Sequence, residues 1–206
     1  MEKEYADMLD QIKVWRPSDQ ITIDNPTSLK MIGRGQQGVV FQIDDKRCVK
    51  VYYNPISLQR ELRAMQAGEK EGITPKVYFW GDNYLVMEYL TAPSLYDYLQ
   101  KKPLTKDLSK KVIKLLETFA KVGYNRFDHS GRHIYLMFDG KMKVIDVVHI
   151  IKPSPVLFSR KLISDMGQHA ETFIKHVKEI SPKWYNRWVK HPDFADTMLK
   201  AKSTNS

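Results

Sequence analysis

Residues 32–40 read Ile32-Gly33-Arg34-Gly35-Gln36-Gln37-Gly38-Val39-Val40, and Cys48-Val49-Lys50 follows after seven further residues. The three glycines let backbone N–H groups approach a phosphate with no Cβ in the way. Lys50 adds a positive charge that suits the same phosphates. The stretch therefore predicts a nucleotide-binding loop, and the residues around it decide which kind.

The residues after the loop separate three kinds of glycine-rich phosphate site. A dinucleotide-binding loop leads from a strand into a helix. Here Val39–Ile43 is β-branched and aromatic, which predicts a strand on both sides of the loop. A Walker A loop needs Gly-Lys-Ser/Thr, and this chain lacks it. The strand-loop-strand arrangement that covers the phosphates of ATP in protein kinases fits best.

Composition narrows the class of protein further. The chain has 206 residues, of which 42% are hydrophobic, enough for one sizeable core or two small lobes. No apolar run reaches the roughly 18 residues that span a bilayer, and the N-terminus lacks a signal-peptide stretch. Cys48 is the only cysteine, which excludes an internal disulfide. These features predict a cytoplasmic protein with no membrane span.

The formal charge of +9 favours polyanionic partners, of which nucleotides are one class. The basic residues are spread along the chain in short clusters, so a solvated basic face is the expected interpretation and a nucleic-acid partner is not expected. A basic nucleic-acid-binding module stays open as an alternative. Its mark would be an affinity that falls steeply with salt.

The first ninety residues mostly alternate with period two. We expect strands over 28–32, 39–43, 47–52, 76–80 and 84–89. A helix should begin at Pro55 and end near residue 70, with Leu58, Leu62 and Met65 on one face. Ahead of these elements, residues 7–15 predict a short helix and residues 17–26 a loop.

From Ala92 the pattern becomes mostly helical. We expect helices over 94–100, 105–122, 159–179 and 182–190, and a last helix that ends near residue 200. A hairpin over 134–145 should turn at Asp139-Gly140. The tail 203–206 is expected to fray.

Glu61 stands out on the first helix. It lies three residues after Leu58 and four before Met65, on the core side, where a carboxylate needs a partner. The alternative is an exposed Glu61 that balances Arg60 or Arg63.

Two aspartates near the hairpin complete a possible phosphate site. Asp146 follows the apolar strand 142–145, which would deliver its carboxylate to a strand end, and Asp128 lies in the loop before the hairpin. Mg²⁺ prefers one or two carboxylates together with phosphates. Two carboxylates, a lysine and a glycine loop therefore indicate a site for ATP with Mg²⁺.

Along the sequence come the glycine loop, Lys50, Glu61, the hinge-like segment 84–90, Asp128 and Asp146. In this order of motifs the chain resembles the protein-kinase-like superfamily. Within it the chain is most similar to small bacterial serine/threonine-protein kinases and to the RIO and lipopolysaccharide kinases, over about residues 28–180. The resemblance implies an α+β, two-lobed fold. Its N-lobe would hold a five-stranded sheet plus one helix, and its C-lobe would be reduced and mostly helical. The implied domains are an extension over 1–27, a kinase-like domain over 28–200 with lobes at 28–90 and 93–200, and a tail over 201–206.

The resemblance also implies roles. Residues that would bind the nucleotide are Gly33, Arg34, Gly35, Gln36, Gln37, Gly38, Val40, Cys48, Lys50, Glu61, Met87, Glu88 and Leu90. Lys50 and Asp128 would be catalytic, the lysine on the α- and β-phosphates and the aspartate on the acceptor hydroxyl. Asp146 and His133 would hold Mg²⁺, and Asp165 would anchor the catalytic loop. The implied reaction transfers the γ-phosphoryl group of ATP to a serine or threonine of a protein substrate.

The chain departs from the family pattern at three places. His133 stands where asparagine is expected, and its nitrogen suits Mn²⁺ better than Mg²⁺. Val147-Val148 replace the Phe-Gly that usually follows the metal-binding aspartate, and Phe127 replaces an arginine. These departures leave two alternatives open: a nucleotide-binding pseudokinase or interaction module without turnover, and a small-molecule or sugar kinase.

Overall fold

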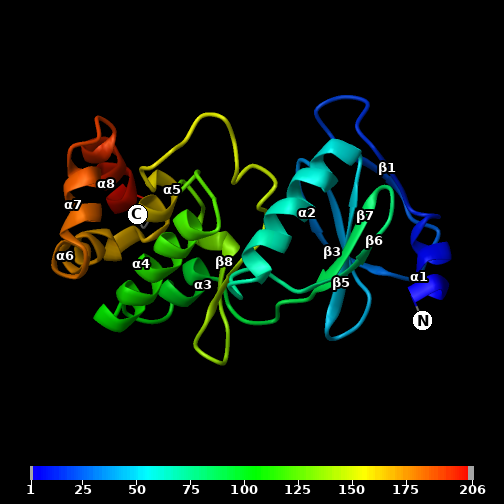
Figure 1. The fold of residues 1–206 in the computed structure, drawn as a ribbon, viewed down its shortest axis with the longest axis horizontal. Helices are drawn as coiled ribbons and strands as arrows, with labels where there is room; N and C mark the ends of the chain where they lie inside the picture. Colours follow the sequence, from blue (N-terminus) through cyan, green and yellow to red (C-terminus); the bar gives the residue numbers. More distant parts are fainter. Residues whose placement is uncertain (1, 204–206) are drawn as a thin grey trace. The chain divides into compact units, whose positions relative to one another are not determined.

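The structure, a computed structural model, describes residues 2–203 and divides into two compact units (Figure 1). The first unit comprises the described residues up to Glu69 together with Thr74–Thr91. The second comprises Lys70–Ile73 and the described residues from Ala92 onward. Each unit is described by itself.

The first unit is built on a five-stranded antiparallel sheet. In spatial order its strands are β3 (Lys30–Arg34), β4 (Gly38–Gln42), β5 (Arg47–Tyr52), β7 (Tyr84–Glu88) and β6 (Val77–Trp80). Helix α2 (Pro55–Glu69) connects β5 to β6. The predicted five strands and helix are confirmed, with ends that differ by at most two residues.

The segment before the sheet differs from the expectation. It folds as helix α1 (Glu2–Leu9) and a hairpin of β1 (Lys13–Trp15) and β2 (Thr22–Asp24). The predicted helix over 7–15 and the predicted loop over 17–26 are therefore wrong. The antiparallel pairing of β1 with β2 is a contact between distant residues, and burial against the sheet outweighs local propensity.

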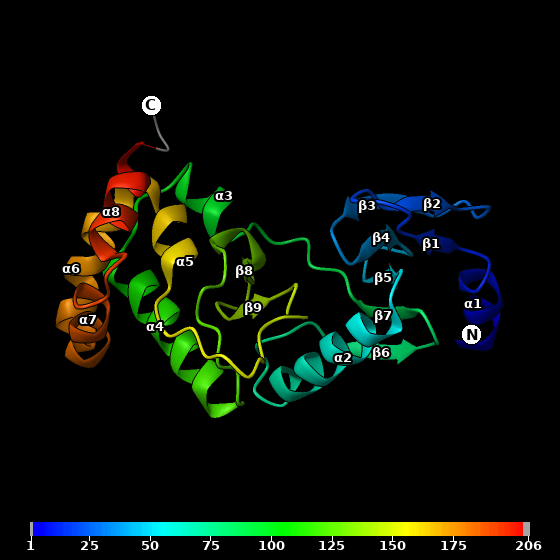
Figure 2. The ribbon, with the colours of Figure 1, turned by 90° about the horizontal axis from the view of Figure 1, so that it is seen from above.

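The two faces of the sheet have different surroundings. One face carries Val39, Phe41, Val49, Val51 and Val86, which form a single core with Leu9, Ile12 and Ile21 of the N-terminal segment. Helix α2 covers the other face, as Figure 2 shows. Because side chains alternate along a strand, Cys48, Lys50 and Tyr52 of β5 face α2, whereas Arg47 lies on the face of Val49 and contacts Tyr5 of α1.

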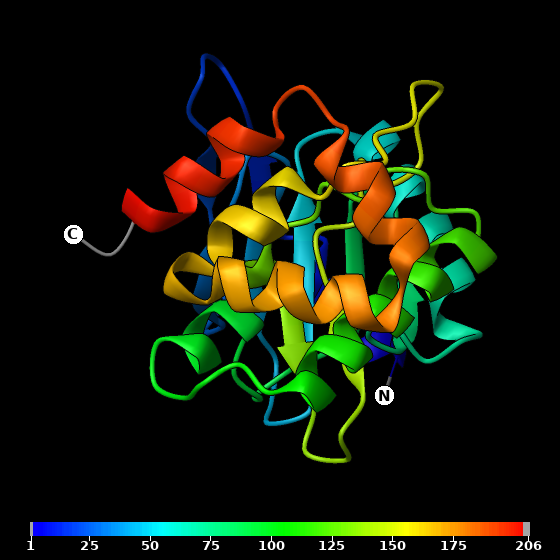
Figure 3. The ribbon, with the colours of Figure 1, turned by 90° about the vertical axis from the view of Figure 1, so that its left-hand side faces the viewer.

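The second unit is mostly helical. Its helices are α3 (Leu95–Leu99), α4 (Lys106–Lys121), α5 (Arg160–Asp165), α6 (Ala170–Ile180), α7 (Pro182–Val189) and α8 (Phe194–Ser203). A short hairpin pairs β8 (Ile134–Leu136) with β9 (Met142–Val144), as expected. In Figure 3, α6 (light orange) and α8 (red) lie beside α5 (yellow), and α7 (orange) packs against α6 and α8.

Two helix predictions in this unit need correction. The single helix expected over 159–179 is interrupted by a 3₁₀ turn over Gly167–His169. Gly167 has a φ of 55°, a left-handed conformation that ends α5 and that glycine adopts without steric cost. Helix α8 continues to Ser203, and the remaining residues of the predicted frayed tail, 204–206, lie outside the described residues.

None of the helices within residues 2–203 combines the length and the apolar character that a membrane span requires.

Candidate functional site

Strand β5 brings together four of the nucleotide-binding candidates of the first unit. Lys50 lies opposite Val40 of β4, and Cys48 lies opposite Met87 of β7. Cross-strand partners point to the same side of a sheet, so these four residues share the face that α2 covers. The register thus gathers candidates that are up to 47 residues apart in the sequence.

Lys50 and Glu61 form a buried ion pair. The Lys50 Nζ atom lies 2.6 Å from Glu61 Oε2, and the two residues are 8% and 2% exposed. The Tyr52 hydroxyl donates a second hydrogen bond to the same Glu61 oxygen, at 2.8 Å. Sequence reasoning missed Tyr52, although its position two residues after Lys50 places it on the same face.

The glycine loop forms the turn between β3 and β4. Gly35 N–H donates to the Gly38 carbonyl at 3.0 Å, which closes the turn. A Cβ on Gly38 would lie 2.1 Å from the Val51 carbonyl oxygen of the neighbouring strand, whereas a Cβ on Gly35 would meet nothing within 4 Å. Gly38 is therefore required by close strand packing, and Gly35 leaves the backbone at the turn open.

The other residues of the loop differ in their contacts. The Arg34 guanidinium donates to the Ile21 carbonyl, and Gln36 is exposed. Gln37 accepts a hydrogen bond from the Ser57 hydroxyl at 2.8 Å, which ties the loop to the first turn of α2. This tie was missed because nothing in the local sequence pairs residues 20 positions apart.

Two of the hinge candidates, Met87 and Glu88, are the last residues of β7, and the third, Leu90, follows it. Glu88 N–H donates to the Lys76 carbonyl at 2.9 Å, and the Glu88 carboxylate accepts from Lys76 N–H at 3.0 Å. Met87 and Leu90 are buried. Among residues 2–203, Leu90 N–H has no hydrogen-bond partner, so it can donate to a ligand.

Cys48 is a packing residue of this face. Its thiol is buried, and burial raises its pKa to about 12. A thiol held neutral in this way is unreactive and offers an apolar surface.

The remaining candidates belong to the second unit, where the loop 124–133 holds Asp128. One oxygen, Oδ1, accepts a hydrogen bond from Lys161 N–H in the first turn of α5, at 2.6 Å. The other oxygen, Oδ2, has no partner among the described residues. The carboxylate is thus fixed through one oxygen and offers the other.

Asp165 holds the same loop from α5. Its Oδ2 accepts hydrogen bonds from the Ser130 hydroxyl at 2.6 Å and from Gly131 N–H at 2.9 Å. Asp165 therefore holds the loop at Ser130 and Gly131, and Lys161 holds it at Asp128, so three hydrogen bonds from α5 fix residues 128–131.

Asp146 and His133 lie side by side. His133 Nδ1 is 3.7 Å from Asp146 Oδ2, and Ile145 N–H donates to the His133 carbonyl at 3.0 Å. Asp146 has a φ of 57°, a value that no other non-glycine residue of the described chain shares. Such a backbone costs of order 1–3 kcal/mol and is typical of functional positions. The pair offers one carboxylate and one imidazole to a cation.

His129 is a further residue that the sequence did not single out. It lies between Asp128 and Ser130 in the sequence and is buried, and its Nε2 has no hydrogen-bond partner among residues 2–203. Burial, together with the nearby His133, lowers the pKa of His129 to about 4. Its ring centre lies 5.6 Å from that of His133, so the imidazole beside Asp146 packs on a neutral one.

Comparisons with known proteins bear on the fold. No protein-family model matches the chain. It is 26% identical over 125 residues to a protein of Bacillus subtilis (strain 168) named "Putative serine/threonine-protein kinase YrzF". The matched region is 58% of this chain and 58% of that relative, so the match spans little more than half the length of either protein.

Two solved structures share the fold. The ternary complex of streptomycin, ATP and APH(2")-IIa matches 98% of this chain and 86% of that one, with a TM-score of 0.51 and 15% identity. Monomeric WbdD matches 82% of this chain and 45% of that one, with a TM-score of 0.51 and 16% identity. These similarities confirm the predicted α+β, protein-kinase-like fold and the predicted resemblance.

Proposed function

We propose that this chain, which has the protein-kinase-like fold, transfers the γ-phosphoryl group of ATP to the hydroxyl of a serine or threonine in a protein. The observation that carries the proposal is the buried pair of Lys50 and Glu61, 2.6 Å apart, in which Lys50 lies opposite Val40 of β4, the strand that follows the glycine turn. A buried charge needs a partner, and Glu61 fixes the lysine in one position. A fixed cation on β5 and a glycine turn with open space at Gly35 on the adjoining hairpin together suit a polyphosphate.

Asp128 would act on the acceptor. Its Oδ2 would orient the acceptor hydroxyl and take its proton as the hydroxyl oxygen bonds to the γ-phosphorus. The bond from that phosphorus to the bridging oxygen breaks, and ADP leaves with the electron pair. Lys161 N–H, bonded to Oδ1, keeps the carboxylate in place during this step.

Asp146 and His133 would hold the divalent cation. Their donor set, one carboxylate and one imidazole nitrogen, fits a cation that completes its coordination with phosphate oxygens and water. When bound, the cation neutralises phosphate charge. Asp146 combines its left-handed backbone with an exposed carboxylate, which leaves the carboxylate accessible to a cation.

Two alternative functions have support of their own. An imidazole 3.7 Å from the Asp146 carboxylate would, when protonated, compete with a cation, which favours nucleotide binding without turnover. A small-molecule acceptor is favoured by the fold shared with APH(2")-IIa, whose complex contains streptomycin and ATP and which matches 98% of this chain.

The test is transfer of radiolabelled γ-phosphate with Mg²⁺ or Mn²⁺, to the protein itself, to a generic basic protein and to streptomycin. We expect transfer to protein, and a fall of about 10²- to 10⁴-fold in Asp128→Asn. Asp139→Asn is the matched control, because Asp139 lies in the turn of the β8–β9 hairpin and has no role in the proposed reaction.

The outcomes separate the alternatives. Equal transfer by wild type and Asp128→Asn would refute the role of Asp128. Thermal stabilisation by ATP with no transfer in either metal would establish the pseudokinase. Transfer to streptomycin alone would establish a small-molecule kinase.

A further inference from the structure

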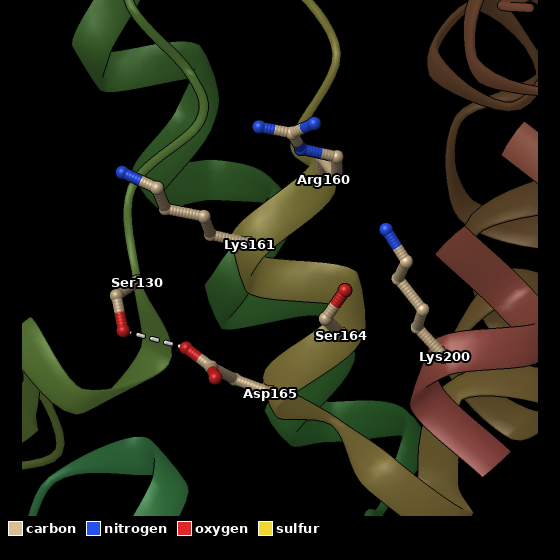
Figure 4. A pocket seen from close by; sticks show the side chains of 6 residues that line it. All are labelled: Ser130, Arg160, Lys161, Ser164, Asp165 and Lys200. Atoms are coloured by element: carbon tan, nitrogen blue, oxygen red, sulfur yellow. Dashed lines mark hydrogen bonds between the residues drawn. The ribbon is translucent and has the colours of Figure 1, made fainter. Parts of the chain in front are cut away.

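A pocket of about 240 Å³ opens beside the loop that holds Asp128. It is lined by Ser130, Arg160, Lys161, Ser164, Asp165 and Lys200, as Figure 4 shows. All six residues belong to the second unit, and they come from the catalytic loop, α5 and α8. The pocket therefore joins three segments that are far apart in the sequence.

The pocket is lined by more positive than negative charge. Three of the six residues are cationic, and the single carboxylate, Asp165, is already bonded to the Ser130 hydroxyl and to Gly131 N–H. Within residues 2–203, neither Arg160 nor Lys161 forms an ion pair with a carboxylate. Figure 4 shows Asp165 turned to Ser130, the Lys161 side chain on the same side of α5 as Ser130, and the Lys200 side chain extending from α8 on the other side of α5.

The pocket adjoins the proposed base. Lys161, which lines the pocket, donates its backbone N–H to Asp128 Oδ1 at 2.6 Å, and Ser130 follows Asp128 by two residues. A molecule that presents a hydroxyl to Asp128 would therefore bring its neighbouring groups to the pocket. Those groups meet a guanidinium, two ammonium groups and the Ser164 hydroxyl, all of which can donate hydrogen bonds.

We propose that this pocket binds an acidic side chain that flanks the acceptor serine or threonine, so that the protein prefers acidic or already phosphorylated substrates. A guanidinium binds carboxylate and phosphate through paired hydrogen bonds, and lysines add charge. The inference rests on the proposed function for the hydroxyl, but the pocket's preference for anions is measurable without turnover.

The test is direct binding to the full chain. Three fluorescent peptides share one sequence around a serine and differ at a flanking position, which is aspartate, asparagine or phosphoserine. At low salt we expect the aspartate and phosphoserine peptides to bind about 10-fold tighter than the asparagine peptide. The preference should shrink at high salt because exposed charges are screened.

The variant that tests the site carries Arg160→Gln, Lys161→Gln and Lys200→Gln together. Its matched control carries Lys101→Gln, Lys110→Gln and Lys114→Gln, three exposed lysines of the same unit that lie away from the pocket. Both variants lose three positive charges, so the net charge changes equally. We expect the pocket variant to lose the preference and the control to keep it within about 2-fold. If the triple variant fails to fold, Arg160→Gln and Lys161→Gln singly should each lower the preference.

Several results would overturn the proposal. Equal binding of the aspartate and asparagine peptides by wild type would do so, as would a preference that persists in the pocket variant or disappears in the control. Displacement of the phosphoserine peptide by an equal concentration of inorganic phosphate would show a pocket for free phosphate instead of a peptide. Selective binding with no phosphate transfer to any acceptor would leave the pocket standing and refute the proposed function.

Discussion

His129 should make the stability of the second unit depend on pH between 4 and 6.5. Burial lowers the pKa of His129 in the folded protein from its ordinary value of 6.5 to about 4. Below pH 6.5 the unfolded chain binds a proton that the folded protein does not, so the free energy of unfolding falls as the pH falls. The difference of roughly 2.5 pH units, at roughly 1.4 kcal/mol per unit, corresponds to about 3 kcal/mol. The loss is complete near pH 4.

The measurement is urea unfolding followed by circular dichroism at steps from pH 7.5 to pH 4. Removing the imidazole with His129→Gln should flatten the pH dependence by about 3 kcal/mol relative to wild type, whatever the variant does to stability at pH 7.5. Phe119→Leu is the control. Phe119 packs edge-on against His129 at 6.1 Å, so the variant disturbs the same core but keeps the titrating group.

A constant difference between wild type and His129→Gln across this pH range would refute the reasoning. It would mean that the folded protein protonates His129 as readily as the unfolded chain does. A flattened pH dependence in Phe119→Leu as well would point to a general loss of packing. Only a change confined to His129→Gln assigns the effect to the buried imidazole.

Two further predictions concern the first unit. Glu61→Gln should lower the free energy of unfolding by about 1.5–3 kcal/mol because it removes the charge from the buried hydrogen bond between Lys50 and Glu61. Glu71→Gln, which weakens the exposed pair with Lys121, should cost less than about 1 kcal/mol, and equal losses in urea unfolding would contradict this. Gly38→Ala should lower the melting temperature by several degrees because its Cβ would lie 2.1 Å from the Val51 carbonyl oxygen, whereas Gly35→Ala should be tolerated. Equal melting temperatures for the two alanine variants would show that β4 shifts without cost.

The sequence predicted the parts of the fold that depend on local periodicity. Strands β4 and β5 follow from alternating apolar residues around a turn, and α2 follows from Pro55 and its apolar face. The hairpin of β1 and β2 was missed because its short strands are stabilised by each other and by the sheet. The interruption at Gly167 was missed because one glycine inside an amphipathic pattern leaves the period intact.

In the candidate site, too, the features that follow from local periodicity were predicted and those that depend on distant contacts were not. The position of Lys50 on β5 followed from the period of two, and the core side of α2 indicated a partner for Glu61. The left-handed backbone at Asp146 and the bond from Lys161 to Asp128 could not be predicted. Both depend on the conformation of the loop between β9 and α5, and the sequence of a loop has no periodic pattern from which its conformation could be predicted.

The residues that depart from the kinase pattern at positions 127, 147 and 148 are apolar and buried. Val147 and Val148 are buried, and Phe127 packs against Trp184 with ring centres 5.1 Å apart.

The backbone of the segment that follows Asp146 is also tied to the loop 124–133, which holds Asp128. Phe127 N–H donates to the Val156 carbonyl at 2.7 Å, and Val156 N–H donates to the Asn125 carbonyl at 2.9 Å. The Asn125 side chain bonds both N–H and carbonyl of Lys152. In a kinase with arginine at the position of Phe127, a phosphate group on the segment would pair with the arginine and so order the segment. Here apolar burial and backbone hydrogen bonds hold the segment without a charge. The substitutions that raise doubt about turnover therefore also supply a reason why turnover would need no activating phosphate.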